Sequence, residues 1–162
     1  MVERTRYFVR LHEDCFNRHL MPGHVSGSAW VVNPARSHAL MLLHRKLNLW
    51  LQPGGHADDD ADITRVVLKE ATEESGIAPE HIRLMSPAIF DVDVHTVYAS
   101  QHGPRHEHFD IRFLIEIDDN IPVPGNDESH QIRWIPLEQI ARFNNARSIF
   151  RLVEKTRRLT AR

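Results

Sequence analysis

The 162-residue sequence has one cysteine, Cys15, no long apolar run and no strong excess of charge of either sign. A single cysteine excludes an intramolecular disulfide and argues against a cysteine-based zinc site. No segment approaches the roughly 20 apolar residues of a membrane span. The formal net charge of -2 supplies no basic field, which argues against nucleic acid as the main partner.

Length and composition predict one compact domain over residues 1–162, with residues 1–24 packed on it as an N-terminal helical segment. The first residues lack the apolar region of a secretory signal, so we expect a cytoplasmic protein with no membrane partner. A homodimer is left open. The unusual count is 12 histidines spread along the chain, which can titrate, bind ligands or decorate the surface.

Hydrophobic periodicity predicts an α/β protein. Apolar residues at helical spacing predict helices over residues 6–20, 62–75, 137–143 and 148–158. Short apolar or alternating runs predict strands over residues 28–34, 39–44, 47–52, 88–98, 106–117 and 131–135. This mixture indicates an α/β sandwich in which a mixed β-sheet lies between helical layers.

Three carboxylates lie at i, i+3 and i+4 near the end of the helix predicted over residues 62–75. Glu70, Glu73 and Glu74 fall within an arc of about 100° on one helix face. Acids this close repel one another unless they are well solvated or a hard cation neutralises them. The apolar stripe that would anchor the helix on the sheet, and so fix the direction of the acids, consists of Ile63, Val67 and Ala71.

The segment that contains these acids resembles the Nudix box, G-x5-E-x7-R-E-U-x-E-E-x-G-U, where U is aliphatic. The matching positions are Gly55, Glu70, Ala71, Glu73, Glu74, Gly76 and Ile77. Two positions depart, since Ala61 replaces the early glutamate and Lys69 replaces the arginine. The resemblance implies a Nudix-like α/β/α sandwich and hydrolysis of acid anhydrides.

The resemblance also implies a divalent cation, Mg²⁺ or Mn²⁺, as cofactor. Its ligands would be the Gly55 carbonyl, Glu70, Glu73 and Glu74. Glu70 and Glu73 would also be catalytic, Glu73 as a further ligand or as the base that orients water. Magnesium prefers carboxylate and water oxygens, and a bound cation lowers the pKa of its water.

The supporting residues of the box are altered. Lys69, which we expect among the catalytic residues, can supply charge but not the paired hydrogen bonds of arginine. The aspartates around Ala61 either rebuild this support or, as the favoured interpretation, stabilise the positive N-terminus of the helix. In the later loop, Glu128 is the candidate general base, and a solvated acid is the equal alternative.

Polar residues alternate with a strict apolar stripe on the two strands predicted over residues 88–98 and 106–117, which we expect to form an antiparallel hairpin. With His56, which follows Gly55, these residues are the predicted substrate contacts: Asp93, His95, His106, His108 and Asp110. An ordinary solvated polar face is the alternative of equal weight. A transition-metal site at His106 and His108 is a less favoured one.

The leading hypothesis is a metal-dependent hydrolase that cleaves a diphosphate linkage in a nucleoside diphosphate derivative or another nucleotide. One alternative is a pyrophosphohydrolase that removes damaged nucleoside triphosphates. The other is a nucleotide-binding module without turnover, for which Ala61 and Lys69 are the argument. Residues that mark particular substrates within the family are missing or ambiguous, so the sequence predicts a small nucleotide-type substrate without specifying it.

Overall fold

The structure, a computed structural model, describes residues 1–99, 103–127 and 129–160. The helices are α1 (Val2–Leu11), α2 (Ile63–Ser75) and α3 (Arg147–Thr160), with short 3-10 helices η1 (Pro79–His81) and η2 (Ile140–Arg142). The strands are β1 (Gly23–Val32), β2 (His38–His44), β3 (Leu49–Leu51), β4 (Gly54–His56), β5 (Arg83–Leu84), β6 (Asp91–Val97), β7 (His106–Glu116) and β8 (Ser129–Pro136). None of the described helices is long and apolar enough to cross a membrane.

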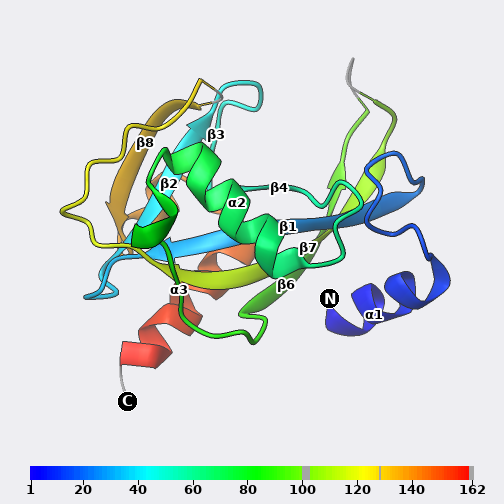
Figure 1. The fold of residues 1–162 in the computed structure, drawn as a ribbon, viewed down its shortest axis with the longest axis horizontal. Helices are drawn as coiled ribbons and strands as arrows, with labels where there is room; N and C mark the ends of the chain where they lie inside the picture. The colour runs from blue at the N-terminus through cyan, green and yellow to red at the C-terminus, as the bar shows by residue number, and fades with distance from the viewer. Residues whose placement is uncertain (100–102, 128, 161–162) are drawn as a thin grey trace.

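The eight strands of the described residues form one mixed sheet. Its centre is the parallel pair of β1 and β7, in register from Gly23 opposite Glu107 to Val32 opposite Glu116. All other pairs are antiparallel, including the predicted hairpin of β6 and β7. Figure 1 shows α2 in front of the sheet and α3 behind it, which confirms the α/β/α sandwich.

Helix α2 forms where the apolar stripe and the glycine predict it. Asp62 caps its N-terminus by accepting a hydrogen bond from the Arg65 backbone at 3.2 Å, and Gly76 ends it in the left-handed conformation at φ 69°. Val67 and Ala71 are both 0% exposed. Since these two residues are buried against the sheet, they fix the rotation of α2 and therefore the direction of its acids.

Two apolar clusters lie on the opposite faces of the sheet. On the α2 face, Val67 and Ala71 pack with the odd-numbered residues of β7, such as Phe113 and Ile115. On the α3 face, Ile149 and Leu152 belong to a second cluster, whose larger sheet residues are Trp30, Met41, Leu114 and Ile135. The alternation predicted for β7 is therefore correct. Both faces of the strand are covered along most of its length, since residues 109–115 are buried.

The N-terminal helix is shorter than predicted. It ends at Leu11 instead of residue 20, because His12 turns to an extended conformation at φ -126°. The segment that follows folds back on the sheet, where the buried Cys15 accepts a hydrogen bond from the Val25 backbone at 2.7 Å. Phe8 stacks on Phe109 with ring centroids 3.9 Å apart, so α1 contributes to the α2-face cluster.

Two further boundaries differ from the predicted ones. Strand β1 begins at Gly23 instead of residue 28, because its polar first half is hydrogen-bonded to β7 and buried. The segment 137–143 forms only the short η2 instead of a helix over its whole length. In both places contacts with the rest of the folded protein, and not local periodicity, determine the structure.

Candidate functional site

The acids of α2 lie against the backbone of β4. Strand β4 pairs with β1, where Gly55 stands opposite Gly27. A Cβ atom on Gly55 would lie only 2.5 Å from the carboxyl carbon of Glu70. Any side chain at this position would displace Glu70, so the glycine allows the carboxylate to reach the strand.

The three carboxylates differ in their surroundings. Glu74 is only 6% exposed and accepts a hydrogen bond from the Gly54 N–H at 2.7 Å. The side chain of Glu70 is 16% exposed, and that of Glu73 is 55% exposed. The structure therefore buries Glu74, leaves Glu70 partly exposed and exposes Glu73 to solvent, all within about one turn of the helix.

Lys69 contacts two of these acids. Its Nζ lies 3.3 Å from the Glu73 carboxylate and 3.7 Å from that of Glu70. The hydrogen bond to Glu73, followed by the charges of Glu70 and Glu73, raises the pKa of Lys69. The lysine thus supplies the positive charge at this position and reaches each acid by one contact, as expected for an ammonium group.

The aspartates before α2 are engaged in local pairs. Asp62 caps the helix, and Asp60 forms a bidentate pair with Arg65 at 2.6 and 2.7 Å. This agrees with the helix-terminus interpretation for Asp62. Asp58 is paired with Arg18, a contact between positions 40 residues apart.

Arg18 is a residue of this site that sequence reasoning missed. Its pKa is raised, mainly by the hydrogen bond to Asp58 and to a smaller extent by the charge of Glu70. Burial, followed by the charge of Arg18, lowers the pKa of His56, and the charge of Asp58 opposes this shift. Arg18 is therefore coupled electrostatically to both Glu70 and His56. No local pattern marks Arg18, because its partners are brought to it only by the folded chain.

The polar face predicted for the hairpin of β6 and β7 lies on the α3 side of the sheet and is buried at its centre. Arg112 is 3% exposed and its guanidinium lies 2.6 Å from Asp110, 3.5 Å from Asp93 and 3.6 Å from Asp91. Asp110 also accepts a hydrogen bond from Ser28 at 2.8 Å. Asp93 and Asp110 therefore do not line an open cleft, and the expectation of a solvated or substrate-facing surface needs correction for these two residues.

Helix α3 contributes to the burial of Asp91 and Asp93, while Asp110 is enclosed by Arg112 and Ser28. Arg151 donates to Asp91 at 2.7 Å and to Asp93 at 3.0 Å, and Lys155 donates to Asp91 at 2.7 Å. Burial raises the pKa of Asp93, but the hydrogen bond from His95 and the charges of Arg112 and Arg151 outweigh it and hold that pKa below its usual range. These contacts describe a buried ion-pair network that joins α3 to the hairpin.

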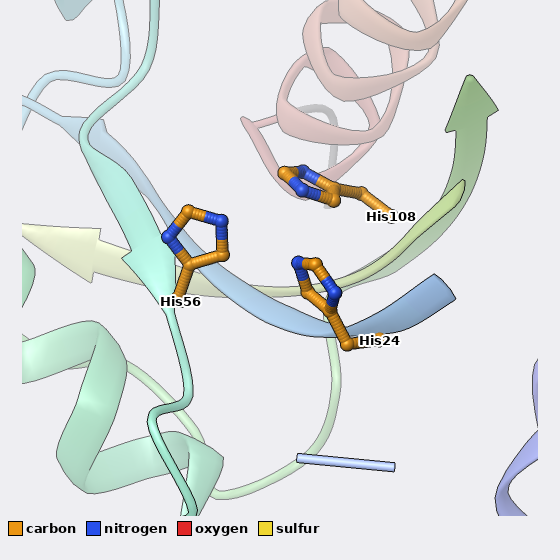
Figure 2. A group of neighbouring side chains, drawn as sticks. All are labelled: His24, His56 and His108. Atoms are coloured by element: carbon orange, nitrogen blue, oxygen red, sulfur yellow. The ribbon is translucent and has the colours of Figure 1, made fainter. Parts of the chain in front are cut away.

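The remaining predicted polar residues gather at the other end of the same face, around a residue that sequence reasoning did not select. His24 on β1 pairs with His108 on β7. His56 on β4 pairs with Ser26, which lies two residues after His24 on β1. Figure 2 shows the rings of His24, His56 and His108 pointing toward one another. Two more histidines flank His108: Nε2 of His106 lies 3.2 Å from its Nε2, and the His95 ring centroid lies 5.4 Å away.

This histidine cluster, defined by His24, His56 and His108, resists protonation. Burial, followed by the charges of His56 and His106, lowers the pKa of His24 to about 4, and the Leu20 backbone opposes this shift only in part. Burial and the four neighbouring imidazoles likewise lower the pKa of His108 to about 2. Near pH 7 both rings are therefore neutral, with a nitrogen lone pair available.

The lowered pKa of His24 predicts a loss of stability in mild acid. Below the unfolded-state pKa of about 6.5 the unfolded chain binds the proton and the folded chain does not, so stability falls as the pH drops toward 4. We expect His24 to account for a decrease of about 2 kcal/mol in the free energy of unfolding between pH 7 and pH 5 in metal-free buffer. Urea unfolding should show this decrease reduced in His24→Gln.

The exposed His81→Gln variant is the matched control and should keep the wild-type pH dependence. If His24→Gln also keeps it, the neutral-ring assignment is wrong. The imidazole resonances of the wild-type protein provide an independent check, since the His24 ring should titrate near pH 4.

Glu128, the candidate general base, lies outside the described residues. Its neighbour Asp127 is exposed in the loop that leads into β8. The role of Glu128 thus remains a prediction from the resemblance.

Comparisons with known proteins agree with the fold. A family model for the NUDIX domain matches residues 23–155. The chain is 30% identical over 105 residues to Phosphatase NudJ of Escherichia coli strain K12, an alignment that covers 62% of this chain and 60% of the relative. The chain thus spans less than two thirds of the length of this curated relative.

Solved structures share the fold at low sequence identity. A C. elegans Ap4A hydrolase in a binary complex superposes with a TM-score of 0.69 at 17% identity, over 85% of this chain and 97% of that chain. The NUDIX domain of Shewanella oneidensis NrtR, in complex with ADP ribose, superposes with a TM-score of 0.58 at 15% identity, over 96% of this chain and 97% of that chain. At these identities the likeness concerns the fold alone.

Proposed function

This chain belongs to the Nudix family, and on that premise we propose that it hydrolyses a diphosphate linkage in a nucleoside diphosphate derivative or another nucleotide, using Mg²⁺ or Mn²⁺ and water. The observation that carries the proposal is the contact of the α2 acids with β4. The Glu70 carboxylate lies against Gly55, and the Glu74 carboxylate is hydrogen-bonded to Gly54. Carboxylate and backbone oxygens at one place are the donors that a hard divalent cation requires.

The residues present fit such a cation. Three carboxylates share one helix face, and the ammonium group of Lys69 lies against two of them, Glu70 and Glu73. Glu70, Glu73, Glu74 and the Gly55 carbonyl would hold the metal, which when bound neutralises phosphate oxygens and lowers the pKa of its water. The absence of a side chain at Gly55 leaves room for the Glu70 carboxylate.

The side chains around the acids would position the reacting groups. Lys69 keeps Glu70 and Glu73 oriented from the solvent side through its two contacts. Glu73, the most exposed of the three acids, would accept a proton from water, with Glu128 as the alternative base.

The nucleotide-binding module without turnover remains a second candidate because of one specific observation. Ala61 removes an acid of the box, and the neighbouring aspartates are paired with Arg65 and Arg18. These aspartates are therefore not free to replace the missing glutamate. A module of this kind would bind nucleotides without releasing products.

A nucleotide panel tests the proposal directly. The protein is incubated with nucleoside diphosphate derivatives, dinucleoside polyphosphates and nucleoside triphosphates, with magnesium, with manganese or with a chelator. We expect metal-dependent release of a nucleoside monophosphate, together with phosphate, pyrophosphate or a phosphorylated product. Ligand-dependent shifts in melting temperature without products would instead support the binding module. No products and no shifts would contradict both.

A further inference from the structure

We propose that the histidine cluster of His24, His56 and His108 is a second metal site, which binds a borderline-soft divalent ion such as Zn²⁺ and is separate from the acids of α2. Each of these side chains offers one ring nitrogen, and these nitrogens all lie within 4.8 Å of one another. The ligands come from three different strands, as Figure 2 shows. The three ligands therefore come together only when the sheet has folded.

The geometry is close to that of a tetrahedral zinc site. A Zn–N distance of about 2.0–2.1 Å places ligand nitrogens about 3.3 Å apart. The nitrogens of the cluster need to approach by at most about 1.5 Å, which small rotations of the histidine side chains can provide. The ring centroids are already 4.8 to 5.2 Å apart in each of the three pairs.

The polar atoms of His24 provide an independent observation. Its side chain is 1% exposed, and neither ring nitrogen makes a hydrogen bond of normal geometry within the described part of the chain, although the nearby Leu20 backbone favours the protonated ring. Leaving a buried polar group unpaired costs free energy, so a folded protein normally satisfies it. A metal ion at the centre of the cluster would bind one of these nitrogens and remove part of that cost.

The chemistry of the ligands selects the class of metal. Three imidazoles without a carboxylate among them suit Zn²⁺, Ni²⁺ or Cu²⁺, whereas Mg²⁺ prefers oxygen. Three protein ligands leave a fourth tetrahedral position for water or for a further nitrogen. His106 is the candidate for that position, since its Nε2 lies 3.2 Å from Nε2 of His108.

Simple packing of neutral rings is the competing explanation. The rings of His24 and His106 are stacked at 5.0 Å, so aromatic contact contributes to the cluster. Packing alone, however, gives no reason to bury two nitrogens of one ring without partners. A zinc ion explains the convergence of the rings and gives one of the two buried His24 nitrogens a partner.

The test uses untagged protein that has been stripped with a chelator and dialysed. It is titrated with Zn²⁺ by calorimetry in a large excess of Mg²⁺, which occupies carboxylate sites. We expect one equivalent of Zn²⁺ to bind, and Co²⁺ to give the visible absorption of a tetrahedral complex. His56→Gln should weaken Zn²⁺ binding by at least about 100-fold, since even the loss of a residue that only supports a ligand costs 10- to 100-fold.

His56 is chosen because it is only partly buried, and His108→Gln provides a second variant from another strand. His81→Gln, at an exposed position, should bind Zn²⁺ like the wild type. The Glu70→Gln, Glu74→Gln double variant should also keep the zinc equivalent. If wild type and His56→Gln bind Zn²⁺ equally, or if only the glutamate variant loses it, the proposal is overturned. Zinc binding in a protein without hydrolase activity would leave this site standing while the proposed function fails.

Discussion

Replacing Glu70 and Glu74 together by glutamine is expected to lower kcat/KM for the metal-dependent reaction by about 1,000-fold or more. A bound cation contributes several kcal/mol of charge stabilisation in the transition state, and each 1.36 kcal/mol corresponds to a factor of ten. Glutamine keeps the size of each side chain and an oxygen that can accept from Gly54, so the fold should persist. Steady-state rates at several magnesium concentrations measure the effect.

The matched control removes two carboxylates elsewhere. Glu80 and Glu138 are exposed, and Glu80→Gln with Glu138→Gln changes the net charge by the same amount. This variant should keep wild-type rates and wild-type metal dependence. If the Glu70, Glu74 variant retains the same kcat/KM as this control, the assignment of the acid site is wrong.

Replacing Arg112 by methionine is expected to destabilise the protein by about 3–5 kcal/mol, because it breaks a buried ion-pair network by removing one partner. Arg112 is 3% exposed and lies among three carboxylates, those of Asp91, Asp93 and Asp110. Arg151 and Lys155 reach Asp91 but not Asp110 in the described contacts, so Asp110 would lose its charged partner. Equilibrium urea unfolding measures the difference.

A surface arginine in the same sheet provides the comparison. Arg83 pairs with Glu116 on β7, and its side chain is 66% exposed. Exposed pairs contribute about 0–1 kcal/mol, so Arg83→Met should be nearly neutral. The double variant Arg112→Met, Asp110→Asn should regain part of the unfolding free energy that Arg112→Met loses, which a double-mutant cycle measures. Equal unfolding free energies for Arg112→Met and Arg83→Met would contradict the network.

The parts of the fold that were predicted correctly depend on neighbours in sequence. Helix α2 carries its own stripe, its Asp62 cap and its Gly76 end within 15 residues, so local periodicity was sufficient. The hairpin of β6 and β7 was predicted for the same reason, since both strands alternate strictly. The start of β1 was not predicted, because its pairing with β7 alone makes the polar segment at His24 a strand.

The same division holds for the candidate site. The grouping of Glu70, Glu73 and Glu74 follows from helix geometry, and Lys69 lies beside two of them as its spacing requires. Arg18 could not be selected, because its partner Asp58 is 40 residues away. The expected cleft along Asp93 and Asp110 was wrong, since both are buried by distant segments: Arg151 of α3 donates to Asp93, and Ser28 of β1 donates to Asp110.

The parallel pairing of β1 with β7 has a consequence for folding. The Ser28–Asp110 contact between these strands joins positions 82 residues apart, so the chain must close a long loop before the pair forms. The strand that holds β4 beside the acids of α2 is β1 itself. A peptide limited to residues 55–77 therefore lacks the strand that positions its carboxylates. A nascent chain on the ribosome should likewise show no metal-dependent activity until β7 has emerged.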